Sequence, residues 1–148
     1  MIPSVMEERA GRHPVSDIDA HGQAMRLPIG RVVAELIEIL GATTVAALGN
    51  VQETRAVQQW TNGRLPQRPH VLRFALQLAM MISSTHDREV ARAWFQGSNP
   101  DLGDRVPVSM LQNEDLADVQ RALIAGARAF ALHEPWDEPE VNPPRKAG

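Results

Sequence analysis

Apolar residues recur at helical spacing through the first half of the chain. One such stripe consists of Val32, Val33, Leu36, Ile37 and Leu40. It predicts a helix over about residues 30–40, which Gly41 ends. A short helix over residues 45–48 and a third over residues 52–61 follow. No alternation of period two is strong enough to indicate a strand, so the pattern predicts an all-α fold.

The second half of the chain continues the helical pattern. Pro69 suits the first position of a long helix over residues 69–83, whose positions are apolar on nearly every side. A further helix is predicted from a cap at Ser84 or Thr85 to about Phe95. A last helix over about residues 115–132 carries the apolar stripe Leu116, Val119, Leu123, Ala127 and Phe130.

Residues 45–61 have the layout of a helix-turn-helix, a helix, a short turn and a second helix. Val57 and Trp60 lie three positions apart and are expected to point inward. The outer face then consists of Gln52, Thr54, Arg55, Gln58 and Gln59. Gln can pair with adenine and Arg with guanine in the major groove, and Arg64 and Arg68 suit backbone phosphates. An ordinary solvated helix face has the same composition, so the pattern alone leaves both interpretations open.

Charge and composition narrow the class of protein. The formal net charge is −3, yet residues 26–70 carry more arginines than acids, which favours attraction to phosphates there. Hydrophobic residues make up 43% and aromatic residues 4%, and there is no Cys, so disulfides and thiolate metal sites are excluded. No apolar run approaches the roughly 20 residues that span a bilayer. We expect a cytoplasmic protein with no membrane segment and no signal peptide.

The chain offers little for catalysis. Its histidines are scattered, without an i,i+4 pair or another metal-ligand spacing. They are His13, His21, His70, His86 and His133. No Gly-rich phosphate loop, nucleophile elbow or Cys–His set is present. The sequence therefore predicts a protein that is not an enzyme and that has no catalytic residues, no cofactor and no metal.

The most specific signal is Trp-x4-Asn-Pro-x-Leu-Gly followed by Pro-x3-Leu. Its residues, with one further glycine, are Trp94, Gly97, Asn99, Pro100, Leu102, Gly103, Pro107 and Leu111. Pro100 presets φ for a turn, and Gly97 and Gly103 can adopt positive φ without steric cost. On physical grounds alone the segment is a tight connection between two helices.

This motif resembles the toxin-binding domain of Xre/MbcA/ParS-type antitoxins, which are partners of RES-domain toxins. Val57-x-x-Trp60-x-x-Gly63 with the following Pro66 also resembles the end of an Xre-type helix-turn-helix. One departure is that Asn50 stands where such motifs place an apolar residue and Val51 where they often place Gly. Either the alignment slips by one residue or the turn is altered. The resemblance covers roughly residues 30–132 and is strongest over 91–111.

The resemblance implies an antitoxin that binds and neutralises a cognate RES-domain, NAD-degrading toxin. It also implies repression of the shared operon through operator DNA, and a homodimer or a larger hetero-oligomer with the toxin. Antitoxins of this kind contact the toxin through C-terminal elements, which implies a set of contact residues here. That set is Arg128, Phe130, Glu134, Trp136, Asp137 and Glu138. A solvated tail that only keeps the protein soluble is the alternative for this end of the chain.

These observations predict four regions along the chain. Residues 1–25 form a flexible leader, and residues 26–68 an Xre-like helix-turn-helix bundle. Residues 69–133 form a small helical toxin-binding or dimerisation domain, and residues 134–148 an acidic, Pro-rich tail. A different class also fits, a stand-alone helix-turn-helix repressor whose C-terminal helices only dimerise.

Overall fold

The computed structural model describes residues 16–132, and this part of the chain is all-α as predicted. Its eight α-helices and one 3-10 turn, in chain order, are α2 (Asp17–Arg26), α3 (Ile29–Leu40), α4 (Ala42–Leu48), α5 (Thr54–Thr61), α6 (Pro69–Ser83), α7 (Arg88–Gln96), η1 (Pro100–Leu102), α8 (Pro107–Asn113) and α9 (Leu116–Ala131). Within the described residues, no helix combines the length and the apolar character that a membrane span requires.

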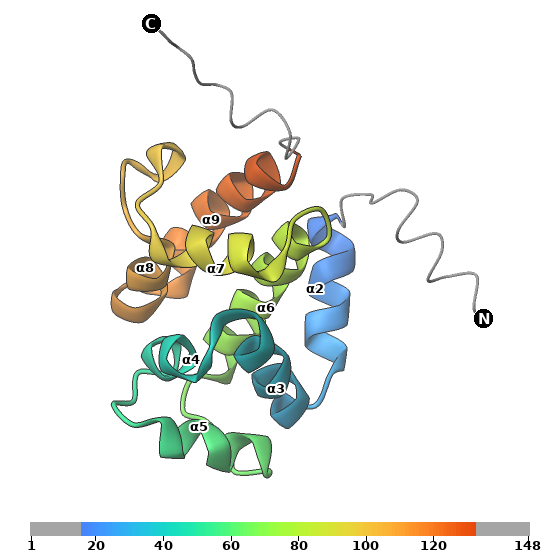
Figure 1. The fold of residues 1–148 in the computed structure, drawn as a ribbon, viewed down its shortest axis with the longest axis vertical. Coiled ribbons are helices and arrows are strands. Elements are labelled where there is room, and N and C mark those ends of the chain that lie inside the picture. The colour runs from blue at the N-terminus through green and yellow to red at the C-terminus, as the bar shows by residue number, and fades with distance from the viewer. Residues whose placement is uncertain (1–15, 133–148) are drawn as a thin grey trace, which may run out of the picture.

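Helix α6 runs through the middle of the molecule, and α2, α3, α7 and α9 surround it (Figure 1). The sequence predicted its bounds, with Pro69 at the first helical turn. It is buried on nearly all sides because apolar residues occupy successive positions and not one stripe. One hydrophobic cluster joins residues from α2 to α9, so the regions 26–68 and 69–133 share a core.

The expectation of a flexible leader to residue 25 is wrong over residues 17–25, which belong to α2; residues 1–15 lie outside the described part. Ser16 caps this helix by accepting a hydrogen bond from the Asp19 N–H at 3.1 Å. Its buried face consists only of Ala20 and Ala24, which pack against α6. Two alanines make too weak an apolar stripe to indicate a helix from the sequence.

Helices α3, α4 and α5 lie close to their predicted positions. The stripe of α3 is buried as expected, except that Ile37 is half-buried. Gly41 ends α3 and at once begins α4, with a φ of 89° that favours glycine. Helix α5 begins at Thr54, two residues later than predicted, and buries Val57 and Trp60.

Two arginines stabilise helix ends from distant parts of the chain. The C-terminal carbonyls of a helix lack partners within it and carry partial negative charge. Arg73 on α6 donates to the carbonyl oxygens of Ala24 (2.8 Å) and Leu27 (2.6 Å) at the end of α2. Arg92 on α7 donates to the Ile39 carbonyl oxygen at the end of α3, at 3.2 Å.

The second half of the chain differs from prediction in two details. Helix α7 begins at Arg88 after Asp87, so neither Ser84 nor Thr85 caps it. Instead, the Ser84 hydroxyl donates to the Met81 carbonyl at 2.7 Å and Thr85 donates to the Ala131 carbonyl at 2.8 Å. Helix α8 and the turn η1 are elements that the periodicity did not predict.

Candidate functional site

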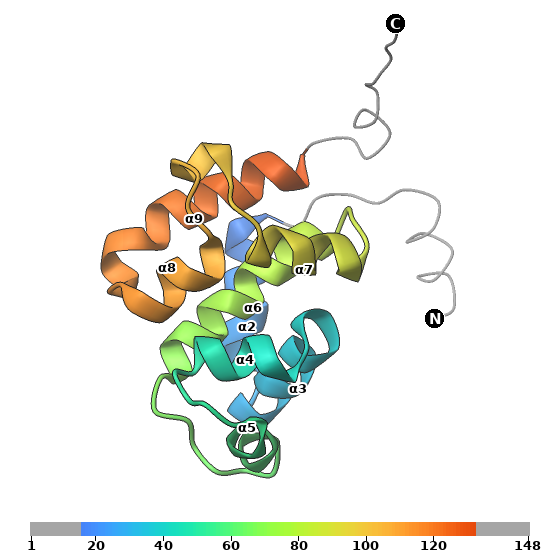
Figure 2. The same cartoon turned by 60° about the vertical axis from the view of Figure 1, so that its left-hand side comes forward.

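The polar residues expected on the outer face of the third helix are exposed. Thr54, Arg55, Gln58 and Gln59 lie on α5, while Gln52 lies in the loop before it. In both views α5 lies at one end of the molecule, away from the end of α9 (Figure 1, Figure 2). The five candidate residues therefore share one accessible end of the fold.

Close contact with Trp60 holds the turn between α4 and α5. A Cβ at Gly49 would overlap the Trp60 ring, with Cζ3 at 2.8 Å, so only glycine fits. The following Asn50 has a φ of 62°, and Val51 is half-buried against the core. Asn is the residue that most readily replaces Gly in this left-handed conformation. The left-handed conformation that favours Gly thus falls at residue 50 of this turn, and the apolar side chain that packs inward falls at residue 51.

The two arginines after α5 have different positions. Arg64 is exposed, as a phosphate contact requires. Arg68, which was expected at the phosphates, is half-buried instead, and its guanidinium donates to three carbonyls. Its Nη1 donates to the Leu48 carbonyl (3.2 Å) and the Gln112 carbonyl (3.3 Å), and its Nη2 donates to the Leu111 carbonyl (2.9 Å). Arg68 therefore joins the C-terminal turns of α4 and α8.

The Trp94 motif forms a packed corner between α7 and α9. Trp94 is 6% exposed, and its ring meets Phe95 edge-on at a centroid distance of 5.2 Å. A Cβ added at Gly126 would lie 3.7 Å from the Trp94 ring and 3.4 Å from the Leu102 side chain. Trp94 and Leu102 thus pack over the same glycine on α9. Pro107 and Leu111 of the motif are buried in α8.

Asn99 organises the turn that follows α7. Its Oδ1 accepts from the Asp101 N–H at 2.8 Å, and its carbonyl oxygen accepts from the Leu102 N–H (2.9 Å) and the Asp104 N–H (2.8 Å). Gly103 has a φ of 68°, as expected, whereas Gly97 has a φ of −103°. The conformational freedom predicted for Gly97 is therefore not used. Pro100 begins the 3-10 turn η1.

Of the residues implied in toxin binding, two are described. Arg128 is exposed and pairs with Asp17 of α2 at 2.9 Å. Phe130 is half-buried, with its ring centroid 4.9 Å from that of His86. The others, Glu134, Trp136, Asp137 and Glu138, lie outside the described residues, as does the tail 134–148 to which they belong.

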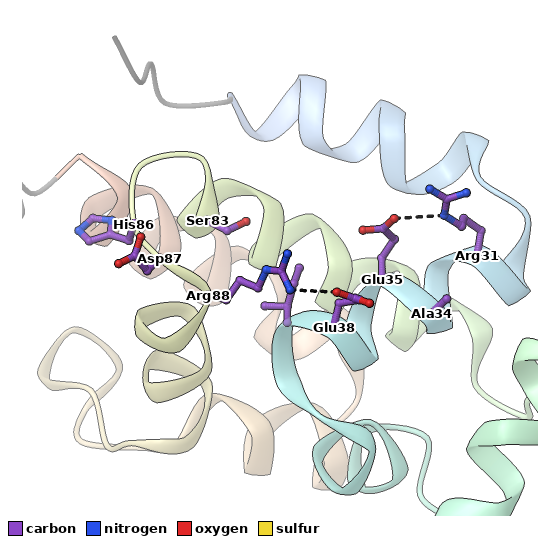
Figure 3. A pocket seen from close by; sticks show the side chains of 9 residues that line it. Arg31, Ala34, Glu35, Glu38, Ser83, His86, Asp87 and Arg88 are labelled. Atoms are coloured by element: carbon purple, nitrogen blue, oxygen red, sulfur yellow. Dashed lines mark hydrogen bonds and ion pairs between the residues drawn. The ribbon is translucent and has the colours of Figure 1, made fainter. Parts of the chain in front are cut away.

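A hollow of about 690 Å³ lies between α3 and the junction of α6 with α7 (Figure 3). Two ion pairs lie at its surface, Arg31–Glu35 at 3.1 Å within α3 and Arg88–Glu38 at 2.9 Å between α7 and α3. Both are exposed, so each stabilises the fold by no more than about 1 kcal/mol. Figure 3 shows His86 at the opposite end of the hollow from Glu35. These groups do not converge on a point where acid–base chemistry could occur.

Among residues 16–132 no group of three or more His, Asp or Glu side chains is placed to hold a metal ion. Comparison with protein-family models finds no matching model, and searches of curated proteins and of solved structures find no match. The family resemblance therefore stays a prediction from the sequence motif.

Proposed function

We propose that this chain is an antitoxin of the Xre–RES type, which binds a cognate RES-domain toxin and represses their shared operon. The observation that carries the proposal is the Trp94–Leu111 motif. Trp94 and Leu102 pack over Gly126 at one corner, Pro107 and Leu111 are buried in α8, and Asn99 supplies the hydrogen bonds of the turn. In this proposal the chain is not an enzyme and needs no cofactor or metal.

The proposed toxin contacts lie at the end of α9 and beyond it. A cleft that accepts NAD must hold two phosphates, so it carries basic groups. The acids of the sequence after Leu132 match such groups in charge, and Phe130 supplies an apolar anchor. Because α5 lies at the other end of the fold, toxin and DNA can be bound at the same time (Figure 2).

The direct test is co-expression with the product of the neighbouring gene, which this proposal expects to be a RES-domain protein, followed by pull-down and an assay of NAD consumption. Complex formation and loss of NAD consumption are expected. If the neighbouring protein neither binds nor is inhibited, the antitoxin proposal is wrong. Promoter binding by the isolated chain would then favour a stand-alone repressor.

Truncation after Ala131 tests the role of the tail. We expect the shortened chain to keep its fold, because Ala131 is the last buried residue described, and to lose inhibition of NAD consumption. Pull-down and the NAD assay measure binding and inhibition separately. A full-length variant with Glu134→Gln, Asp137→Asn and Glu138→Gln separates the effect of the acidic charges of the tail from the effect of removing the tail. If the truncated chain still inhibits fully, the surface between residues 91 and 131 inhibits by itself.

Helices α4 and α5 are proposed to act as a helix-turn-helix, with α5 in the major groove. The left-handed Asn50 and half-buried Val51 support an alignment shifted by one residue, in which the turn is not altered. The exposed polar face of α5 and Arg64 supply the base and phosphate contacts.

Alanine at Arg55 or Gln58 is expected to weaken promoter binding by about 1–3 kcal/mol each, because a specific base contact is lost. Both side chains are exposed, so thermal stability stays unchanged. Arg121→Ala on α9 and Gln23→Ala on α2 are matched controls, since both residues are exposed away from α5. No promoter shift by the wild-type chain at low salt, alone or with its toxin, would rule out the DNA-binding role.

A further inference from the structure

A groove of about 490 Å³ lies beside the Trp94 motif, between α7, the turn after it and the end of α9. Its apolar lining includes the half-buried Val90 and Phe130, the buried Trp94 and the exposed Pro100. An aliphatic or aromatic side chain of a partner is the kind of group that such a lining accepts.

The rim of this groove is acidic. Glu89 and Asp101 are exposed on it, and among residues 16–132 no Lys or Arg lines it. Among the ion pairs of the described residues, none includes either carboxylate. The arginines that flank Glu89 in sequence are engaged elsewhere, since Arg88 pairs with Glu38 and Arg92 donates to the Ile39 carbonyl. Two uncompensated carboxylates beside an apolar surface favour a cationic partner and disfavour a nucleic acid.

Trp94, which lines the groove, carries an unmet hydrogen-bond donor. The indole Nε1 of Trp94 is buried and has no acceptor among the described residues. Buried donors without a partner are uncommon in proteins and require an explanation. A backbone carbonyl of a bound segment can satisfy this donor once neighbouring side chains shift to admit it.

We propose that this groove docks a basic segment of the partner, in which one aliphatic or aromatic residue stands beside an arginine. Arginine fits better than lysine because its planar guanidinium pairs with carboxylates through two hydrogen bonds and stacks on aromatic rings. The proposal rests on the antitoxin function, and it assigns the segment to the RES-domain toxin. The toxin thus contacts the folded Trp94 corner as well as the sequence after α9.

A peptide titration tests the groove without the toxin. The probe is N-acetyl-Leu-Arg-amide, added to the ¹⁵N-labelled full chain, and the readout is the Trp94 indole N–H resonance, assigned with Trp94→Phe. A saturable shift is expected, absent with N-acetyl-Leu-Glu-amide and absent in the Glu89→Gln/Asp101→Asn variant. Asp118→Asn is the matched control, since Asp118 and Glu89 both lie in the first turn of a helix. No shift, or an equal shift with the acidic peptide, overturns the proposal.

The purified RES-domain protein supplies the second measurement. The Glu89→Gln/Asp101→Asn variant is expected to bind it about tenfold more weakly, whereas Asp118→Asn binds like wild type. Equal binding by the double variant overturns the docking proposal and leaves the antitoxin function standing. If the wild-type chain does not bind this protein at all, the antitoxin function fails, and with it the toxin as the occupant of the groove.

Discussion

Replacing Trp94 by alanine is expected to lower the free energy of unfolding by about 3–5 kcal/mol, which is the usual cost of deleting a buried aromatic side chain. Trp94 is 6% exposed and packs between Phe95 and the surface of α9 at Gly126. The cavity left behind removes contacts on both sides. Urea denaturation followed by far-UV circular dichroism measures the change in free energy. Thermal unfolding is expected to show a fall in Tm of about 10 °C or more.

Two variants in the same contact act as controls. Trp94→Phe keeps most of the volume and is expected to lose less stability than the alanine variant. Gly126→Ala is expected to raise stability by about 0.5–1 kcal/mol. Its Cβ reaches Leu102 and Trp94 at 3.4 and 3.7 Å, which are ordinary contact distances, and alanine favours a helix. If Trp94→Ala melts like wild type but loses toxin binding, Trp94 belongs to the interaction surface and not to the core.

The sequence predicted those helices whose burial is encoded by a broad apolar stripe. Helices α3, α6 and α9 were placed within about two residues, because a wide stripe specifies both the helix and its buried face. Helix α2 was missed because tertiary polar contacts stabilise it. Arg73 caps its end and Asp17 pairs with Arg128, and these partners lie far along the chain. Local periodicity contains no signal for them.

Helix α8 was missed for a different reason. It has only seven residues, and its buried face comes from Pro107, Met110 and Leu111. Isolated helices of that length are marginal in water, so packing and the Arg68 guanidinium must stabilise it. The motif residues Pro107 and Leu111 were predicted, but the helix that connects them was not.

The sequence predicted the candidate-site residues whose exposure follows from helical periodicity. It could not predict the position of a long side chain that turns toward the interior of the fold. The polar face of α5 followed from the positions of Val57 and Trp60. Arg64 and Arg68 looked equivalent in sequence, since both follow α5 in a loop. Only the tertiary structure shows that carbonyls from two helices converge on Arg68. The acidic groove was also hidden, because Glu89 and Asp101 lie on separate elements.

Arg68→Ala is expected to lower the free energy of unfolding by about 3 kcal/mol. The change removes charged hydrogen bonds worth about 1.5–3 kcal/mol in such settings and leaves carbonyls at the ends of α4 and α8 without a partner. Arg68→Lys is expected to recover only part of this stability, because an ammonium lacks the forked donors that reach both helices. Urea denaturation of the three proteins measures both effects.

Arg64→Ala is expected to change promoter binding and not stability, the reverse of Arg68→Ala, because Arg64 is exposed in the same loop. Its stability is expected to stay within about 0.5 kcal/mol of wild type. Its promoter affinity falls for all sequences alike, and the salt dependence of binding decreases by about one unit, as for a lost phosphate contact. Measured under conditions where it stays folded, Arg68→Ala keeps the wild-type salt dependence. A reduced salt dependence in folded Arg68→Ala would instead place its guanidinium on DNA, against the contacts it makes with Leu48 and Leu111.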